Sequence, residues 1–196
     1  QNPDSQIVTD KVWHELAFGL ESLGVNSNEI RLKIAEVASF FGIQNWIHKN
    51  VNELSGGQKQ LLNLASIMAM QPDVVILDEP TSQLDPIAAQ EFLQTISKLN
   101  REFGITVILS EHRLFDAVPL SDRVLVMEEG KIIAYDTPSR VGEVIKDNDM
   151  FKALPVPMRV YEKFPDNQKC PVTIREGKEW LYNLSQESEI NKDIKF

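Results

Sequence analysis

Two adjacent carboxylates follow a short apolar run in the middle of the chain. Residues 74–77 are all aliphatic, and Asp78 and Glu79 come directly after them. Such a run is typical of a strand buried on both faces of a sheet, and open α/β sheets bind ligands at the carboxyl ends of their strands. At that edge one carboxylate could hold Mg²⁺ through water, and its neighbour could act as a general base. The alternative is a pair of solvated carboxylates at a strand end.

A helix start made of small and polar residues precedes this run. Ser55, Gly56, Gly57 and Gln58 stand at the beginning of a helix that we expect to reach about Met70. A helix amino terminus offers unpaired N–H groups and the positive end of the helix dipole, and glycines let a phosphate approach the backbone. These residues are therefore candidates for binding phosphate, with an ordinary capped helix as the alternative.

The elements around these residues follow from hydrophobic periodicity. Helical spacing runs from about Lys11, with Thr9 as a candidate cap, to Leu23, and again from Asn26 to Phe41. Beyond residue 72 strands alternate with helices, which indicates an α/β fold with a parallel sheet. The predicted strands cover residues 74–77, 105–109, 123–127 and 132–135, and further helices are predicted from Pro86, after His112 and from Pro138.

The composition shifts after about Asp149. Four prolines predict an extended linker, and the capping-box spacing of Thr173 and Glu176 predicts a helix to about Leu184. We therefore expect three segments, a helical part at residues 1–72, an α/β core at 73–149, and a linker with a helix at 150–196. The prolines are Pro155, Pro157, Pro165 and Pro171.

Composition excludes several classes of protein. The net charge of −9 over 196 residues argues against a nucleic-acid partner held by a basic face. The single cysteine, Cys170, has no partner for a disulfide within the chain, as is usual in a reducing compartment. No apolar run approaches the ~20 residues that cross a bilayer, and no signal peptide is visible, so any membrane role is expected to come through a partner.

Four motifs occur in order between Leu54 and His112. They are LSGGQ at residues 54–58, VVILDE at 74–79, SQLD at 82–85, and the histidine after the next strand. In this order and spacing the chain resembles the ATPase subunits of ATP-binding cassette (ABC) proteins, in which these are the signature motif, Walker B, the D-loop and the switch histidine. The resemblance implies a P-loop NTPase core of ABC type, with an α-helical signature subdomain, and covers roughly residues 1–144.

The resemblance also implies a role for each catalytic residue. Asp78 would position Mg²⁺, Glu79 would act as the general base on the attacking water, and His112 would contact the γ-phosphate of ATP. Gln1, at the start of a Gln-Asn-Pro-Asp stretch, resembles the Q-loop glutamine that touches Mg²⁺ and links the site to a transmembrane partner. A disordered chain end is the alternative for Gln1.

The remaining motif residues would act across a dimer. Ser55, Gly56, Gly57 and Gln58 would bind ATP that is held by a second ABC ATPase domain, and Asp85 would join the two domains. The second domain could come from a homodimer, a heterodimer or a tandem cassette. The signature motif would thus have no function without another copy of the domain.

Three stretches are similar to one branch of the family. Residues 1–4, 18–24 and 110–113 resemble ATPases of energy-coupling factor (ECF) transporters, which import vitamins and cobalt or nickel ions. This implies a peripheral protein at the cytoplasmic face of the cell membrane, bound to a transmembrane scaffold protein. Trp13 and Phe18 are candidates for the docking surface, with core packing as the alternative for each. Residues 154–157 and 171–177 also resemble the connector of ECF ATPases with two cassettes.

The chain departs from the family pattern in two places. No GxxxxGK[ST] phosphate loop (Walker A) occurs in the 196 residues. The family places this loop, with an aromatic residue that stacks on adenine, upstream of the Q-loop glutamine, so we expect a truncated chain without its nucleotide-binding half. Leu61 stands where the family usually has arginine, which could weaken the signature half-site. Two alternatives stay open, an ABC ATPase outside transport and a non-catalytic dimerising or regulatory fragment.

Overall fold

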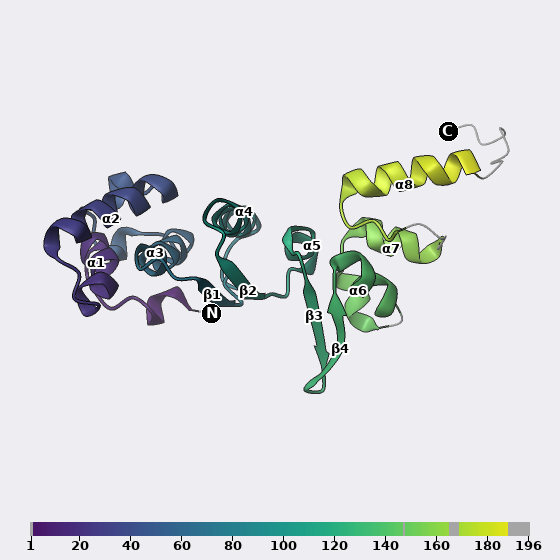
Figure 1. Ribbon diagram of the computed structural model, residues 1–196, viewed down its shortest axis with the longest axis horizontal. Helices are drawn as coiled ribbons and strands as arrows, with labels where there is room; N and C mark the ends of the chain where they lie inside the picture. The colour runs from purple at the N-terminus through teal and green to yellow at the C-terminus, as the bar shows by residue number, and fades with distance from the viewer. Residues whose placement is uncertain (1, 147, 165–168, 188–196) are drawn as a thin grey trace. The chain divides into compact units, whose positions relative to one another are not determined.

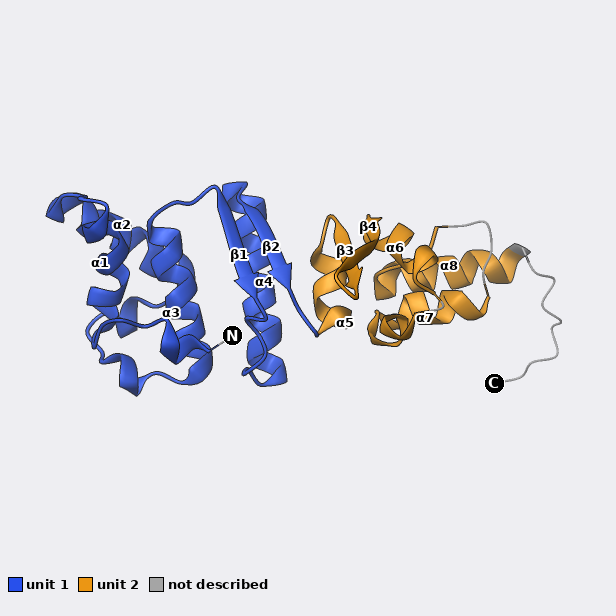
Figure 2. Cartoon of the chain, turned by 90° about the horizontal axis from the view of Figure 1, so that it is seen from below, with its two compact units in different colours: residues 1–112 blue, residues 113–196 orange. Residues whose placement is uncertain are grey.

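The computed structural model describes residues 2–146, 148–164 and 169–187, which form two compact units, residues 1–112 and 113–196 (Figure 2). Gln1 lies outside the described residues, so its place in a Q-loop stays a prediction. The division into three segments also stays a prediction, because the boundary between the two units does not test it.

Unit 1 begins with three helices that pack on one another (Figure 1). They are α1 (Val12–Ser22), α2 (Ser27–Phe41) and α3 (Gly56–Ala69), and all three were predicted. The short 3₁₀ turns η1 (Pro3–Ser5), η2 (Gln44–Trp46) and η3 (Val51–Glu53) lie between and before them. Their buried aliphatic side chains form one core, to which Leu16, Ile34 and Leu62 contribute.

The predicted cap of α1 is wrong, whereas the predicted start of α2 near Asn26 is confirmed. The backbone N–H and hydroxyl of Thr9 both donate to Oε2 of Glu15 at 2.9 Å, and Lys11 occupies the cap position without a side-chain bond. Asn26 caps α2 by accepting the Glu29 N–H at 3.1 Å. Gly42 ends α2 in the left-handed region at φ +69, where glycine carries no steric penalty.

A parallel pair of strands follows, with one helix between them. Strands β1 (Val74–Asp78) and β2 (Thr106–Ser110) pair in parallel, and α4 (Pro86–Phe103) makes the crossover. Figure 2 shows α4 along one face of the pair, where Val75 and Leu77 pack against its apolar side chains. The prediction of burial on both faces is wrong, because Ile76 is 70% exposed and Ile108 is 53% exposed on the other face.

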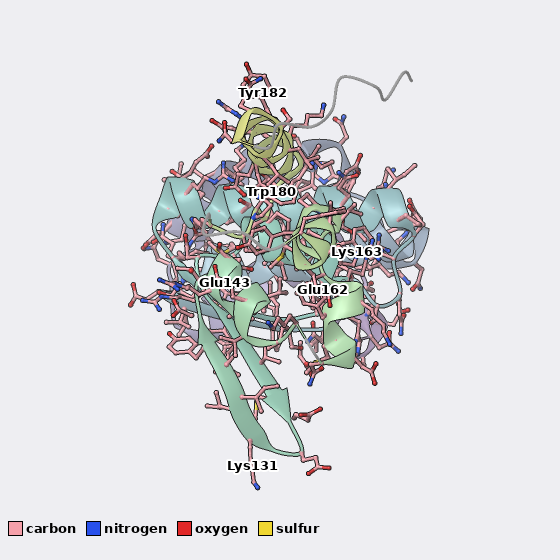
Figure 3. The ribbon with its side chains drawn as sticks, turned by 90° about the vertical axis from the view of Figure 1, so that its right-hand side faces the viewer. Lys131, Glu143, Glu162, Lys163, Trp180 and Tyr182 are labelled. Atoms are coloured by element: carbon pink, nitrogen blue, oxygen red, sulfur yellow. The ribbon has the colours of Figure 1, made fainter. Side chains whose placement is uncertain are left out.

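Unit 2 contains an antiparallel hairpin. Strands β3 (Val124–Glu128) and β4 (Lys131–Asp136) are joined by residues 129–130, and Lys131 lies at the tip (Figure 3). The strands were predicted, but parallel pairing does not extend to them, since a two-residue connection joins only antiparallel strands. The other short elements are α5 (Leu114–Ala117), η4 (Val118–Leu120), α6 (Pro138–Val144) and η5 (Asp149–Ala153).

Two helices end the described chain, where the prolines predicted an extended linker. Helix α7 (Val156–Lys163) forms because Pro155 is its cap and Pro157 lies in its first turn, where a backbone N–H has no helical partner. Helix α8 (Ile174–Glu187) has the predicted capping box, in which Glu176 accepts the Thr173 N–H at 2.9 Å. The extended-linker prediction is therefore wrong for α7, and the α8 prediction is confirmed.

The core of unit 2 combines buried side chains of the hairpin, α6, η5, α7 and α8. The rings of Tyr161 and Trp180 meet edge to face with centroids 5.4 Å apart, and Figure 3 shows Trp180 on the inner side of α8 and Tyr182 on its outer side. Cys170 is free and buried in this core. Burial, with Glu143 and Glu176 nearby, raises the pKa of its thiol to about 12, so the cysteine is held in its neutral form.

Among the described residues, none of the helices combines the length and the apolar character that a membrane span needs.

We expect Leu62→Ala to lower the free energy of unfolding of unit 1 by about 2–5 kcal/mol, because the substitution leaves a cavity around a fully buried side chain of α3. The control is Leu32→Ala on α2, where the side chain is exposed and the change should stay within about 0.5 kcal/mol. Urea denaturation followed by circular dichroism measures both. Equal effects of the two variants would contradict the packing described here.

Candidate active site

The register of the two parallel strands brings their last residues together. Asp78 pairs with Ser110, so the carboxyl ends of β1 and β2 meet at one edge of the sheet. The hydroxyl of Ser110 donates to Oδ1 of Asp78 at 2.5 Å. This bond fixes the orientation of the Asp78 carboxylate and leaves its second oxygen available for a cation.

Glu79 leaves the strand in an unusual conformation. Its φ is +44, in the left-handed region that costs a non-glycine residue roughly 1 kcal/mol or more. The Glu79 N–H donates to the carbonyl oxygen of Ser110 at 3.0 Å and to its hydroxyl at 3.2 Å. The turn thereby directs the Glu79 side chain toward the residues that follow β2.

His112 meets Glu79 at this point. Its Nε2 lies 2.9 Å from Oε1 of Glu79, and with a proton on Nε2 the imidazole donates to the carboxylate. The side chain of Glu79 is 27% exposed and that of His112 is 83% exposed. The pair is therefore accessible to solvent, and the second carboxylate oxygen of Glu79 is available to accept a proton from water. The structure brings together three of the predicted residues, Asp78, Glu79 and His112.

Two residues of this edge were not identified as site residues from the sequence. Ser110 holds Asp78, as described, and Oε1 of Glu111 accepts the backbone N–H of Thr81 at 3.1 Å. Both residues follow the second apolar run, so the rule that placed Asp78 and Glu79 at the edge could have placed them there too. What the sequence does not show is which side chain faces which partner.

The predicted phosphate-binding residues form the amino terminus of α3. Ser55 caps the helix by accepting the Gln58 N–H at 3.3 Å, and Gln58 accepts the Ser55 N–H at 2.9 Å. This is the reciprocal capping box, so the local fold already uses both side chains. The Ser55 hydroxyl proton and the amide group of Gln58 are still available as donors to an anion.

Asp85 is likewise engaged in the fold. Its Oδ1 accepts the N–H groups of Ile87 and Ala88, each at 3.0 Å, which makes it the cap of α4. A carboxylate at this position also complements the positive end of the helix dipole. Its second oxygen has no bond among the described contacts and can take a donor from another chain.

The two helix starts lie side by side. A Cβ atom on Gly57 would lie 3.5 Å from Cβ of Ala88 and 3.8 Å from Cδ2 of Leu84, whereas one on Gly56 would meet nothing within 4 Å. Gly57 thus packs against α4, and Gly56 faces open space in which a phosphate could approach the backbone. Within the described residues, no hydrogen bond or ion pair joins Ser55 or Gln58 to Glu79, so this chain keeps the two groups of predicted residues separate.

The donor set fits Mg²⁺ only as part of a complex with phosphate. Among the described residues, no cluster of three or more His, Cys, Asp or Glu side chains could hold a metal. Mg²⁺ is usually bound through one or two carboxylates together with waters and substrate phosphates. The free oxygen of Asp78 satisfies that requirement, and Glu79 is occupied with His112.

Leu61 and the pocket of unit 1 belong to the framework. Leu61 is half-buried and packs against both cores of unit 1, so leucine at this position serves packing.

A pocket of about 260 Å³ lies between α2, α3 and α4 near Asp73 and Ile105. Because these two residues precede β1 and β2, the pocket lies at the opposite edge of the sheet from Asp78.

Comparison with known proteins shows what the chain is similar to. Residues 4–82 match the family model described as ABC transporter. A putative ABC transporter ATP-binding protein of Bacillus thuringiensis subsp. konkukian is 45% identical over 195 residues, which are 99% of this chain and 35% of that protein. The chain belongs to the ATP-binding domains of ABC transporters. The fold class predicted from the sequence is confirmed.

Two further ABC proteins are similar to this ABC domain. The energy-coupling factor transporter ATP-binding protein EcfA1 of Caldanaerobacter subterraneus subsp. tengcongensis is 44% identical over 156 residues, 79% of this chain and 54% of that protein. The structure of cbiO1 from Clostridium perfringens, described as part of the ABC transporter complex cbiONQ, has a TM-score of 0.67 at 29% identity and covers 78% of this chain and 63% of that one. The ABC domain spans only 35% of the length of the Bacillus relative.

We expect Asp85→Ala to lower the free energy of unfolding by about 1 kcal/mol, because two backbone N–H groups of α4 lose their acceptor. Asp85→Asn keeps an acceptor oxygen and should lose less than half as much, and Gln90→Ala, at an exposed position on the same helix, serves as the control. Urea denaturation compares the three variants. An Asp85→Ala variant as stable as the control would show that the cap is dispensable.

Proposed function

We propose that the protein is the ATP-hydrolysing subunit of an ECF-type ABC importer, for vitamins or for cobalt or nickel ions. The observation that carries the proposal is the Glu79–His112 pair, 2.9 Å apart, at the same sheet edge as Asp78. A carboxylate that faces a histidine beside a cation-binding aspartate is the arrangement needed to activate water next to a metal-bound phosphate.

Each residue at the edge has a distinct role in the proposed reaction. The free oxygen of Asp78 holds the metal, and bound Mg²⁺ supplies positive charge to the phosphates of ATP. Glu79 accepts the proton of the attacking water at the oxygen that His112 does not use. His112 holds Glu79 in place through Nε2 and, being exposed, presents its ring to the γ-phosphate.

The signature and the D-loop act between two domains in this proposal. Ser55, Gly56, Gly57 and Gln58 bind the γ-phosphate of ATP held by a second ABC ATPase domain, through the donors that the capping box leaves available. Asp85 offers its second oxygen to the opposing domain. The proposal therefore predicts that hydrolysis requires a dimer, whether homodimeric, heterodimeric or formed by tandem cassettes.

Hydrolysis also requires a phosphate loop, and the 196 residues contain none. The tests therefore use the polypeptide that carries this sequence as its source cell makes it. Its intact mass and amino-terminal sequence are determined first.

Two observations support the assignment to ECF transporters: the sequence similarity to EcfA1 and the exposure of Phe18 on α1. EcfA1 is named an energy-coupling factor transporter ATP-binding protein and shares 44% identity with this chain. Phe18 is exposed on α1, whereas Trp13 is partly buried against the core, so Phe18 is the better candidate for contact with a transmembrane scaffold. We accordingly place the protein at the cytoplasmic face of the membrane, held there by that scaffold, with no nucleic-acid partner.

We expect Glu79→Gln to lower kcat for ATP hydrolysis by about 10²–10⁴-fold, because the amide cannot accept the proton of water. ATP affinity should be nearly unchanged. A phosphate-release assay and nucleotide binding measure the two quantities, with Glu91→Gln, at an exposed position on α4, as the control. Hydrolysis by Glu79→Gln at the wild-type rate would overturn the assignment of the base, and absence of hydrolysis by the wild type would favour a non-catalytic role.

We also expect the protein to co-purify with an integral membrane protein after mild detergent extraction, and Phe18→Glu to abolish this association without changing the ATPase rate. The reason is that burying the charged glutamate side chain in an apolar interface would cost binding free energy. Leu32→Glu, at another exposed apolar position, on α2, is the control. Recovery of the protein free of any membrane protein would favour an ABC ATPase outside transport.

A further inference from the structure

Glu111 is the one residue between Ser110 and His112, and it faces a different loop. Ser110 bonds to Asp78 and Glu79, and His112 bonds to Glu79. Glu111 instead accepts the Thr81 N–H at 3.1 Å. Glu111 and His112 lie beyond the end of β2, and their side chains reach separate partners.

Thr81 anchors the loop that leads to Asp85. Its side chain is 2% exposed, and its hydroxyl has no hydrogen-bond partner within the described residues. Its carbonyl oxygen accepts the Leu84 N–H at 3.0 Å, so Thr81 begins the turn that ends at the cap of α4. The bond from the Thr81 N–H to Glu111 consequently ties this turn to the residue that follows β2.

The hydrogen bond from the Thr81 N–H to Glu111 is of a strong type. Its acceptor is a carboxylate, and hydrogen bonds to ionised groups are roughly twice as strong as neutral ones. Both residues are shielded from solvent in part, since Thr81 is buried and Glu111 is of intermediate exposure, and a lower local dielectric strengthens such a bond further. This bond therefore links the Thr81 loop to the residue that directly precedes His112.

We propose that Glu111 is a positioning residue that couples the loop at residues 80–85 to His112. The inference rests on the proposed function, in which Asp85 faces the opposing domain and His112 holds the base. When the opposing domain fixes the loop, Glu111 fixes the backbone before His112, and the Glu79–His112 pair keeps its geometry. Without Glu111 the loop and the pair would move independently.

The test compares Glu111→Ala with Glu111→Gln in the polypeptide made by the source cell. Glu111→Ala removes the acceptor and should lower kcat for ATP hydrolysis about 10-fold, with less than about a 2-fold change in KM. Glu111→Gln keeps an oxygen that can accept the Thr81 N–H and should stay within about 3-fold of the wild type. Glu102→Ala, at an exposed position on α4, is the control and should not change the rate.

A second readout tests the contact itself. Amide hydrogen exchange over residues 81–85, measured by mass spectrometry, should be faster in Glu111→Ala than in the wild type, and should be near the wild-type rate in Glu111→Gln. Exchange that is unchanged in Glu111→Ala would show that the bond does not hold the loop, and would overturn the proposal.

Other outcomes separate this inference from the proposed function. If the wild type hydrolyses ATP, Glu79→Gln does not, and Glu111→Ala is fully active, the inference is wrong and the proposed function stands. A fall in kcat that is equal in Glu111→Ala and Glu111→Gln, or that only follows a lower melting temperature, would also overturn it. A wild type without ATPase activity would overturn both.

Discussion

The parallel pairing of β1 with β2 is the constraint on which the site depends. The register places Asp78 opposite Ser110, so the residues after each strand emerge at the same edge. Two apolar runs, with α4 as the crossover, produce this pairing, because parallel strands need a long connection that packs on the sheet. A shift of one residue would turn Asp78 to the other face and separate Glu79 from His112. The positions of the side chains at this edge are thus set by the pairing of β1 with β2 and by the packing of α4 on these strands.

The starts of α3 and α4 impose a second constraint. Ser55 and Asp85 cap these helices. The Ser55 hydroxyl oxygen accepts a backbone N–H and still has its proton to donate, and Asp85 uses one carboxylate oxygen and keeps the other. Gly57 lies against Ala88 and Leu84, where an added Cβ would make ordinary van der Waals contact. In the proposed function the same residues serve both stability and binding, so a substitution at either cap is expected to change both. Measurements of stability are needed beside any measurement of activity at these positions.

Local patterns predicted most of the elements and the helix starts near Asn26, Ser55 and Thr173, because these depend on neighbours within four residues. The failures depend on tertiary contacts. An apolar run does not reveal whether one or both faces of a strand are covered, as Ile76 shows. Proline-rich sequence at residues 155–157 is compatible with a linker and with a helix start. The bond between Thr81 and Glu111 joins residues 30 positions apart, and only the register of the strands brings them together. The identities of Asp78, Glu79 and His112 were available from the sequence, but their mutual geometry was not.

The backbone of Glu79 shows why this geometry is a property of the pair of strands. A left-handed φ of +44 is unfavourable for glutamate, and nothing within β1 compensates for it. The compensation comes from β2, through two bonds from the Glu79 N–H to Ser110 and one contact between the carboxylate and His112. The proposed base is therefore held by the opposite strand end and would relax if the two ends moved apart. In the proposed reaction the two strand ends must stay in register, so the residues after β2 are expected to matter for catalysis together with the proposed base.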